Sequence, residues 1–533
     1  MEMEPGRPSS QKRTTAAEPL NAREEPTLNG EEGGEGGDGD RIGNLPDGVL
    51  VVNRDTSRKR KLAAPAAAEA PNTGAGTQGQ GPPLSGADGG AGDRISHLPN
   101  GVLGDIISLL PTKEGARTQI FASRWRHLWR SAPLNLDHNW LCNDERALDT
   151  VVSRILSTHP GPGRRFCAPV YHLKSNQADA WLRSPALDNL YELELCSFEH
   201  RLPYPPPTPL PPPAAAFRFS ETLCVATMGD CHLQDGTTQA LHFPKRSRLN
   251  GSAYPNPRSS LHSMIAGCPA LECLLIQNSS GFCCLRINSI SIRSIGCNNS
   301  VYHRGLRFGE LIIENAPCLE RLLQLGSDQP HTSVISAPKL ETLACLFCYS
   351  STRLAFDSTV IQGLRVDSLT TLVHTVKILA VDLHALSLDV VIDLMRCFPC
   401  LERLYIESLG PGKTNFWRRK HRDFIATFDI RLKTISWRYY RGIKSHVDFA
   451  TFFVLNARML ELMTVTVNQE DYNDEFFARQ RKMVQLDSKA SRCALFHFTP
   501  NLSHCSASFF RVHDLDLADP FERKDHYQFS ALS

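Results

Sequence analysis

The chain has 533 residues, which is long for one ordinary domain, so we expect several domains. The formal net charge is only +2, which argues against general binding to nucleic acid or to an anionic membrane surface. Hydrophobic residues make up 41% of the chain, enough for a sizeable core. Because we find no run of about 20 apolar residues and no apolar signal core at the N-terminus, we expect a soluble intracellular protein without membrane contact.

Residues 1–91 are predicted to be a disordered tail, because Gly, Glu, Pro, Ala and Ser dominate and few aromatic residues are present. The basic run at 58–61 is either a nuclear import signal or a solvated charge cluster, so we expect the protein in the nucleus, the cytoplasm or both. Residues 40–50 match residues 93–103 at eight of eleven positions. Since no further helical pattern follows this copy, we interpret it as a duplicated fragment that does not fold.

The segment 92–136 predicts three short helices. Leu98 and Pro99 open the first, where proline is tolerated because its missing N–H would be unpaired there anyway. Pro111 ends it, and Thr112 is predicted to cap the second helix. A large apolar face follows on the third helix. Three helices of this size are too small to bury a complete core alone, so the segment needs another surface.

This segment resembles an F-box, with a Leu-Pro start, an isoleucine- and leucine-rich first helix and a Ser-Arg-Trp-x-x-Leu-Trp finish at 123–129. The resemblance implies a module that docks to the Skp-type adaptor of a cullin-based ubiquitin ligase. The residues that the resemblance assigns to adaptor binding are Leu98, Pro99, Val102, Leu103, Ile106, Ile107, Leu110, Trp125, Leu128 and Trp129.

Two other interpretations of the segment are an ordinary helical hairpin and a basic helix that reads DNA. The second rests on the arginines at positions 117, 124, 126 and 130. Those arginines alternate with large apolar residues that need burial, and no basic domain surrounds them. We therefore do not expect a nucleic-acid partner.

A repeated pattern follows in the region 137–410. Residues 268–274, 316–322, 337–343 and 398–404 share the form Pro-x-Leu-Glu-x-Leu, with a weaker copy at 184–187. The prolines at 317 and 338 lie 21 residues apart, within the period of about 20–29 residues of leucine-rich repeats. This spacing predicts an irregular solenoid whose Leu271, Leu319, Leu340 and Leu401 are core residues. The alternative is an ordinary α/β domain.

Two segments interrupt the repeats. Residues 204–213 are proline-rich, which predicts an exposed loop insert or a polyproline II ligand for an SH3-like groove. Residues 245–260 are polar and lack the leucine pattern of a repeat strand, so we expect the solenoid to be irregular there.

The composition changes again in the region 411–522. Strands are predicted at 430–435, 463–467 and 494–498, and helices around 449–460 and 476–485. This order resembles the C-terminal FBD domain of plant F-box/leucine-rich-repeat proteins. The whole chain is therefore predicted to be a multi-domain α/β protein, with a disordered N-terminus, a short helical F-box, an irregular leucine-rich-repeat solenoid and an α+β FBD-like region.

The chain holds 17 cysteines, an odd number without a secretory signal, so we expect reduced thiols. Two Cys-x-x-Cys pairs, at 345/348 and 397/400, are compatible with a zinc site. Both pairs lie in apolar or repeated surroundings that favour buried thiols instead. We expect no metal and no cofactor.

The motif search favours binding over catalysis. We find no glycine-rich phosphate loop, zinc-protease helix or nucleophile elbow, and the 19 histidines are scattered. The resemblance implies a non-catalytic substrate-recognition adaptor of an SCF-type (Skp–cullin–F-box) E3 ubiquitin ligase, whose repeats bind a protein target that the sequence does not identify. The alternative is a leucine-rich-repeat interaction or scaffold protein that is no longer coupled to a ligase.

Overall fold

The computed structural model describes residues 95, 97–137, 145–169, 177–196, 211–219, 221–229, 231, 246–250, 261, 265, 268–299, 308–326, 328–348, 353–410, 412, 415–501, 515 and 521. They belong to one compact unit that spans residues 90–533. The predicted tail of residues 1–91, with its basic run and its repeated fragment, lies outside the described residues. Among the described residues, the helices are too short or too polar to cross a membrane.

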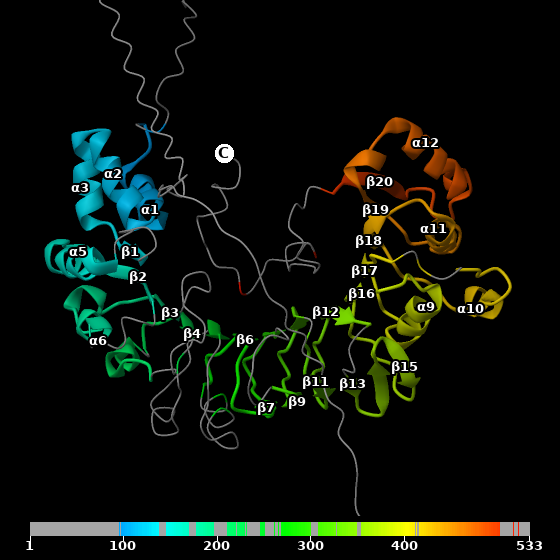
Figure 1. The fold of residues 1–533 in the computed structure, drawn as a ribbon, viewed down its shortest axis with the longest axis horizontal. Helices are drawn as coiled ribbons and strands as arrows, with labels where there is room; N and C mark the ends of the chain where they lie inside the picture. Colours follow the sequence, from blue (N-terminus) through cyan, green and yellow to red (C-terminus); the bar gives the residue numbers. More distant parts are fainter. Residues whose placement is uncertain are drawn as a thin grey trace, which may run out of the picture. The chain divides into compact units, whose positions relative to one another are not determined.

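A parallel sheet runs through the whole described unit (Figure 1). Its strands follow one another in chain order, apart from those that form a second sheet, so each repeat adds one strand beside the last. The strands are β1 (Leu134–Asp137), β2 (Gly163–Pro169), β3 (Glu192–Cys196), β4 (Val225–Gly229), β5 (Arg246–Asn250), β6 (Cys273–Gln277), β8 (Ser294–Asn298), β10 (Arg321–Gln324), β12 (Thr342–Phe347), β16 (Ile378–Asp382), β17 (Arg403–Glu407), β18 (Thr434–Tyr440), β19 (Leu462–Val467) and β20 (Leu495–Pro500).

A second, six-stranded sheet covers the core along the middle strands (Figure 1). Its parallel part continues into two antiparallel pairings at one edge. In sheet order its strands are β15 (Arg365–Ser368), β14 (Thr359–Gln362), β13 (Arg353–Phe356), β11 (His331–Val334), β9 (Glu310–Asn315) and β7 (Cys284–Asn288).

Helices take the place of the second sheet at both ends of the main sheet (Figure 1). The N-terminal helices are α1 (Asn100–Leu109), α2 (Thr112–Arg117), η1 (Thr118–Ile120), α3 (Ser123–Ser131), α5 (Glu145–Thr158), α6 (Gln177–Leu182), η3 (Pro185–Leu187) and η4 (Ala214–Phe219). The C-terminal helices are α9 (Leu388–Cys397), α10 (Arg422–Thr427), α11 (Lys444–Asn456), η5 (Gln469–Asp471), α12 (Asp474–Met483) and η6 (Leu486–Ser488).

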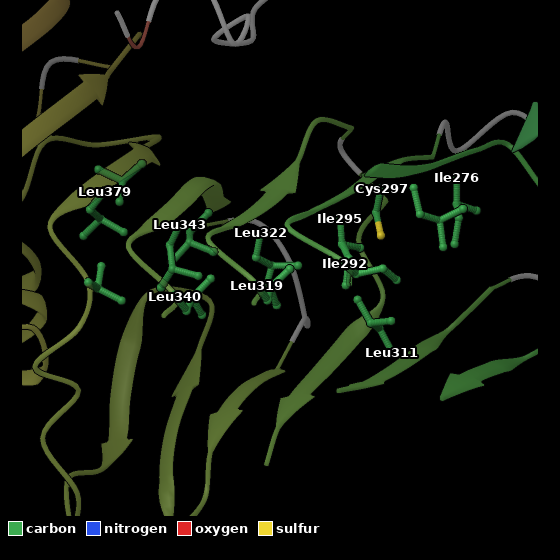
Figure 2. Close-up of a cluster of buried hydrophobic side chains, with 14 of the residues drawn as sticks. Ile276, Ile292, Ile295, Cys297, Leu311, Leu319, Leu322, Leu340, Leu343 and Leu379 are labelled. Carbon is green, nitrogen blue, oxygen red and sulfur yellow. The ribbon is translucent and has the colours of Figure 1, made fainter. Parts of the chain in front are cut away.

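The leucines of the repeated pattern form the core of the solenoid. Leu271, Leu319, Leu340 and Leu401 are all buried, which confirms their predicted core role. Figure 2 shows how successive repeats stack, with Leu319 and Leu322 beside Leu340 and Leu343. Each leucine is covered mainly by the equivalent residues of the neighbouring repeats, so the core is continuous along the sheet.

The polar segment at 245–260 is more regular than we expected. Its first residues form β5, which pairs in register with β4 and β6, so the expectation of a missing strand there was wrong. A strand between two others is held by backbone hydrogen bonds on both edges, which do not require leucines. Residues 251–260 lie outside the described residues, as does the proline-rich segment up to residue 210.

The C-terminal region extends the main sheet. Strand β18 pairs in parallel with β17, so the last three strands share one sheet with the repeats. The predicted strands at 463–467 and 494–498 and the helix at 476–485 are present, with small shifts at their ends. The first predicted strand starts later, at Thr434, because Ile430 and Leu432 are buried in the loop that precedes it.

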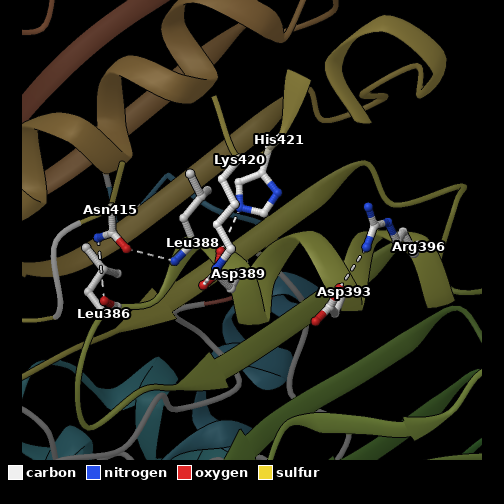
Figure 3. A network of polar contacts seen from close by, with 8 residues as sticks. All are labelled: Leu386, Leu388, Asp389, Asp393, Arg396, Asn415, Lys420 and His421. Carbon is white, nitrogen blue, oxygen red and sulfur yellow. Dashed lines mark hydrogen bonds and ion pairs between the residues drawn. The ribbon is translucent and has the colours of Figure 1, made fainter. Parts of the chain in front are cut away.

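A polar network joins the last repeat to the C-terminal region (Figure 3). The Asn415 side chain accepts a hydrogen bond from the Leu388 N–H at 3.0 Å and donates one to the Ser445 carbonyl at 3.0 Å. Asp389 pairs with Lys420 and with His421. Partial burial raises the pKa of Asp389, but the hydrogen bonds from Lys420 and His421 outweigh this effect and hold it below its ordinary value. These contacts fix α9 to the segment that leads into α10 and α11.

Candidate docking surface on the N-terminal helices

Helices α1, α2 and α3 correspond to the three helices predicted from the sequence. The helix α1 begins at Asn100, so Pro99 occupies the cap position rather than the first helical position that the sequence suggested, and the helix ends before Pro111 as predicted. Thr112 does not cap α2, because it is the first helical residue and Pro111 occupies the cap position. The Thr112 hydroxyl instead donates a hydrogen bond to the Asn135 carbonyl at 2.8 Å. Its role is therefore to fix α2 to strand β1.

Four of the predicted adaptor-binding residues lie in the interior. Leu103, Ile107, Trp125 and Trp129 are buried and belong to the main hydrophobic core. The Trp129 ring lies so close to Gly115 that a Cβ there would come within 2.5 Å of it. These side chains hold the helices on the end of the sheet, so any contribution they make to docking is indirect.

A second set of apolar side chains points outward from the same helices. Val102, Ile106 and Leu109 are 43%, 40% and 42% exposed. Their i, i+4, i+7 spacing places them on one stripe of α1. Ile120 and Phe121, between α2 and α3, are 81% and 68% exposed. We call these five residues the docking surface.

The docking surface shares only Val102 and Ile106 with the residues assigned from the sequence. Leu109, Ile120 and Phe121 were missed, although the regular spacing on α1 was a signal for Leu109. Among the other assigned residues, Leu98, Leu110 and Leu128 are half-buried and Pro99 is exposed. Whether the assigned residues bind an adaptor stays a prediction.

The arginines of this unit have structural partners on the helices. Arg124 donates to the Leu98 carbonyl and to the Asn100 side chain, which joins the start of α3 to the start of α1. Arg117 pairs with Glu114 at 2.8 Å. Two of the four arginines behind the DNA-reading interpretation are thus engaged within the helical unit.

Asn135 in β1 connects the helical unit to the sheet. Its side-chain N–H groups donate to the carbonyls of Ser108 at 2.7 Å and Leu110 at 2.9 Å, which the end of α1 leaves unpaired. Arg164, next to β1 in the sheet, donates to the same Ser108 carbonyl at 3.2 Å. Together with the Thr112 hydrogen bond, these contacts hold the helices rigidly against β1 and β2.

Each Cys-x-x-Cys pair has one buried cysteine, Cys345 in the first and Cys397 in the second. Burial, with a smaller contribution from Asp393, raises the pKa of Cys397 to about 12, and burial also raises the pKa of Cys348. Metal binding needs thiolates, which these surroundings disfavour. Within the described residues, no group of three potential metal-ligating side chains comes together.

Two family models match this chain. The repeats of FBD-associated F-box protein At5g56370 match residues 178–406, and the FBD model matches residues 423–465. The chain belongs to the plant F-box/FBD/leucine-rich-repeat proteins. The matched ranges cover the repeat strands from α6 to β17 and the C-terminal region from α10 into β19.

The relatives of this F-box/FBD/leucine-rich-repeat protein come from Arabidopsis thaliana. FBD-associated F-box protein At5g56370 is 23% identical over 400 residues, which is 70% of this chain and 90% of the relative. F-box/FBD/LRR-repeat protein At4g00160 is 28% identical over 247 residues, covering 43% of this chain and 51% of the relative. F-box/FBD/LRR-repeat protein At3g26920 is 41% identical over 70 residues, 13% and 16% of the two chains. The relatives confirm the predicted family and suggest the role of an F-box substrate adaptor.

Proposed function

We propose that this protein is the substrate receptor of an SCF-type ubiquitin ligase, with the docking surface binding the Skp-type adaptor and the repeat region binding the target. The observation that carries the proposal is the exposed apolar set on α1 and between α2 and α3. Five large apolar side chains exposed on a small helical unit are typical of an interaction site. The family membership supports the identity of the partner.

The rigid attachment of the helices to the sheet supports the same role. A receptor of this kind catalyses nothing itself and works by holding a target near the ubiquitin donor, which raises its effective concentration. The hydrogen bonds of Asn135 and Thr112 fix the helical unit to the repeats, so that the two binding regions keep a constant separation.

The test is a pull-down of the Skp-type adaptor by the full chain carrying Val102→Asp and Ile106→Asp. Both positions are exposed, so we expect normal folding but a loss of adaptor capture of at least about tenfold, because a carboxylate in an apolar interface is left unpaired. The matched control is Ile290→Asp, which is 70% exposed in the repeat region and should leave adaptor capture unchanged.

Unchanged capture by the double variant would contradict the assignment of the docking surface. No capture by the wild-type chain would favour a leucine-rich-repeat scaffold that is not coupled to a ligase.

A further inference from the structure

The two ends of the main sheet differ in what covers their outer edge. At one end, β1 lies against the N-terminal helices, and its Asn135 carbonyl accepts the hydrogen bond of Thr112. At the other end, β20 pairs only with β19 among the strands that the structure describes. An edge strand carries a row of backbone donors and acceptors that can pair with another chain. Strand β20 is therefore a candidate interaction site.

The pairing with β19 determines which backbone groups of β20 point outward. The N–H groups of Leu495 and Asn501 donate to carbonyls on the β19 side at 2.8 and 2.9 Å, and the register between them is unbroken. In a parallel strand, the N–H and C=O groups of alternate residues point to opposite edges. Phe496 and Phe498 therefore direct their backbone groups away from the sheet.

The outward positions on either side of these two residues offer no further donor. Before them lies Ala494, whose N–H and carbonyl are both hydrogen-bonded within the preceding loop. After them lies Pro500, which has no N–H group. The outer edge of β20 thus presents two donors and two acceptors, all on Phe496 and Phe498.

Two copies of this edge fit each other in one antiparallel register. A two-fold axis at His497 places Phe496 of each copy opposite Phe498 of the other, so that all four donors meet all four acceptors in four hydrogen bonds. A shift by two residues places one phenylalanine of each copy opposite Ala494 or Pro500 instead, and hydrogen bonds are lost. The edge is therefore most complementary to a second copy of itself.

The side chains of β20 agree with this register. Phe496 and Phe498 are partly exposed, and the Phe498 ring stacks on Phe477 of α12 with a centroid distance of 4.5 Å. The two-fold pairing places these phenylalanines in two aromatic cross-strand pairs, which stabilise antiparallel strands. On the other face, Leu495 is 57% exposed and comes to lie opposite Thr499 of the second copy. Within β20 there is no charged residue of the kind that protects many edge strands from pairing.

We propose that β20 is a homodimerisation site, at which two copies of this chain pair antiparallel about an axis at His497 and join their main sheets edge to edge. The closed two-fold symmetry uses each edge once, so the assembly stops at the dimer. Six residues per copy form a small interface, so we expect a dissociation constant of roughly 1–100 µM. This inference goes beyond the proposed function and does not depend on adaptor binding.

A cysteine at the axis tests the register. His497 lies opposite its own copy, where the Cβ atoms of an antiparallel pair are about 4.5–5.5 Å apart, close to disulfide geometry. The full chain with His497→Cys should form a covalent dimer on mild oxidation with oxidised glutathione, and mass spectrometry should find residue 497 linked to itself. The matched control Leu495→Cys lies on the same face, but its two copies are about 14 Å apart in this register. It should link no more than the wild-type chain, whose exposed Cys493 sets the baseline.

A charge at the same position tests the association itself. Sedimentation velocity between about 1 and 100 µM should show the wild-type chain passing from monomer to dimer. In His497→Asp, two carboxylates face each other across the axis, so we expect the dissociation constant to rise at least about tenfold. His497 is exposed, so the fold should be kept. The control Ile290→Asp changes a residue that is 70% exposed in the repeat region and should dimerise like the wild type.

Hydrogen exchange identifies what occupies the edge. The N–H groups of Phe496 and Phe498 should exchange more slowly as the concentration of the chain rises. Protection that appears only when another protein is added would mean that the edge binds a foreign strand, and it would overturn the proposal. A wild-type chain that stays monomeric at about 100 µM, or equal linking through residues 495 and 497, would also overturn it. Adaptor capture is a separate measurement, so this inference and the proposed function can fail independently.

Discussion

The docking surface and a small buried cluster on the sheet around Ala380 and Tyr405 both place apolar side chains away from the main core, but they differ in what covers them. On the helices, Val102, Ile106 and Phe121 are open to solvent. On the sheet, Ala380 and Tyr405 are buried and contacted by residues from the far end of the chain. The exposed helical residues are free to contact a partner, whereas the cluster on the sheet is buried by the chain itself.

The largest expected effect comes from the buried side of the helical unit. Trp129→Ala removes a ring packed against Gly115 and should lower the free energy of unfolding by about 3–5 kcal/mol. Phe121→Ala, on the docking surface, should change it by less than about 1 kcal/mol while reducing adaptor capture. Denaturant unfolding and adaptor pull-down measure the two effects. Equal destabilisation by both changes would contradict the division between supporting and docking residues.

The next effect separates a core residue from an exposed residue of the same repeat. Leu340→Ala removes a core leucine and should cost about 2–5 kcal/mol of the free energy of unfolding. Ile335→Ala changes an exposed residue of the same repeat and should cost less than about 1 kcal/mol. Chemical denaturation of the full chain measures the difference. A small cost for Leu340→Ala would mean that neighbouring repeats collapse into the space left behind.

A smaller effect is expected on the covered surface. Tyr405→Phe in the wild-type chain deletes the hydrogen bond to the Leu515 carbonyl, worth about 0.5–1.5 kcal/mol. The loss should appear as faster hydrogen exchange near Leu515, with little change in the exchange of the core strands. If exchange instead rises throughout the repeats, Tyr405 supports the sheet itself rather than the contact with Leu515.

The smallest effect concerns the charges beside the docking surface. Arg117 and Glu114 form an exposed pair on α2, and such pairs contribute about 0–1 kcal/mol. Arg117→Ala should leave both unfolding and adaptor capture close to the wild type. A clear loss of capture would extend the docking surface from apolar to charged residues.

The sequence predicted those elements in which buried apolar residues recur at regular intervals. The Leu-Glu-x-Leu units identified Leu271 and Leu340 as core residues, because each repeat must bury its leucines against its neighbours. Strand β5 was missed because backbone pairing on both edges holds it without an apolar pattern. Boundaries such as the start of α2 depend on single hydrogen bonds, like that of Thr112 to Asn135, which have no signature in the sequence.

The sequence predicted an apolar helical docking site, but it did not predict which of the apolar residues are exposed. The helices do carry the predicted apolar pattern. The spacing of apolar residues alone does not show which of two adjacent stripes is buried. The sequence analysis therefore grouped Leu103, which is buried, with Val102, which is exposed. The buried cluster around Ala380 and Tyr405 had no recognisable signal in the sequence. Gly296, Ala344 and Ala380 are small residues whose importance depends on Phe521 and Leu515, which are distant in the chain.

The hydrogen bonds of Asn135 join the end of α1 to the first strand of the sheet. Because the helices are joined to β1, the proposed role implies that the number of intervening strands would set the distance between the adaptor and a bound target. Eight strand-to-strand steps separate β1 from β12, or about 40 Å along the sheet. In that proposed role, the gain or loss of a single repeat would change the distance between adaptor and target by about 5 Å.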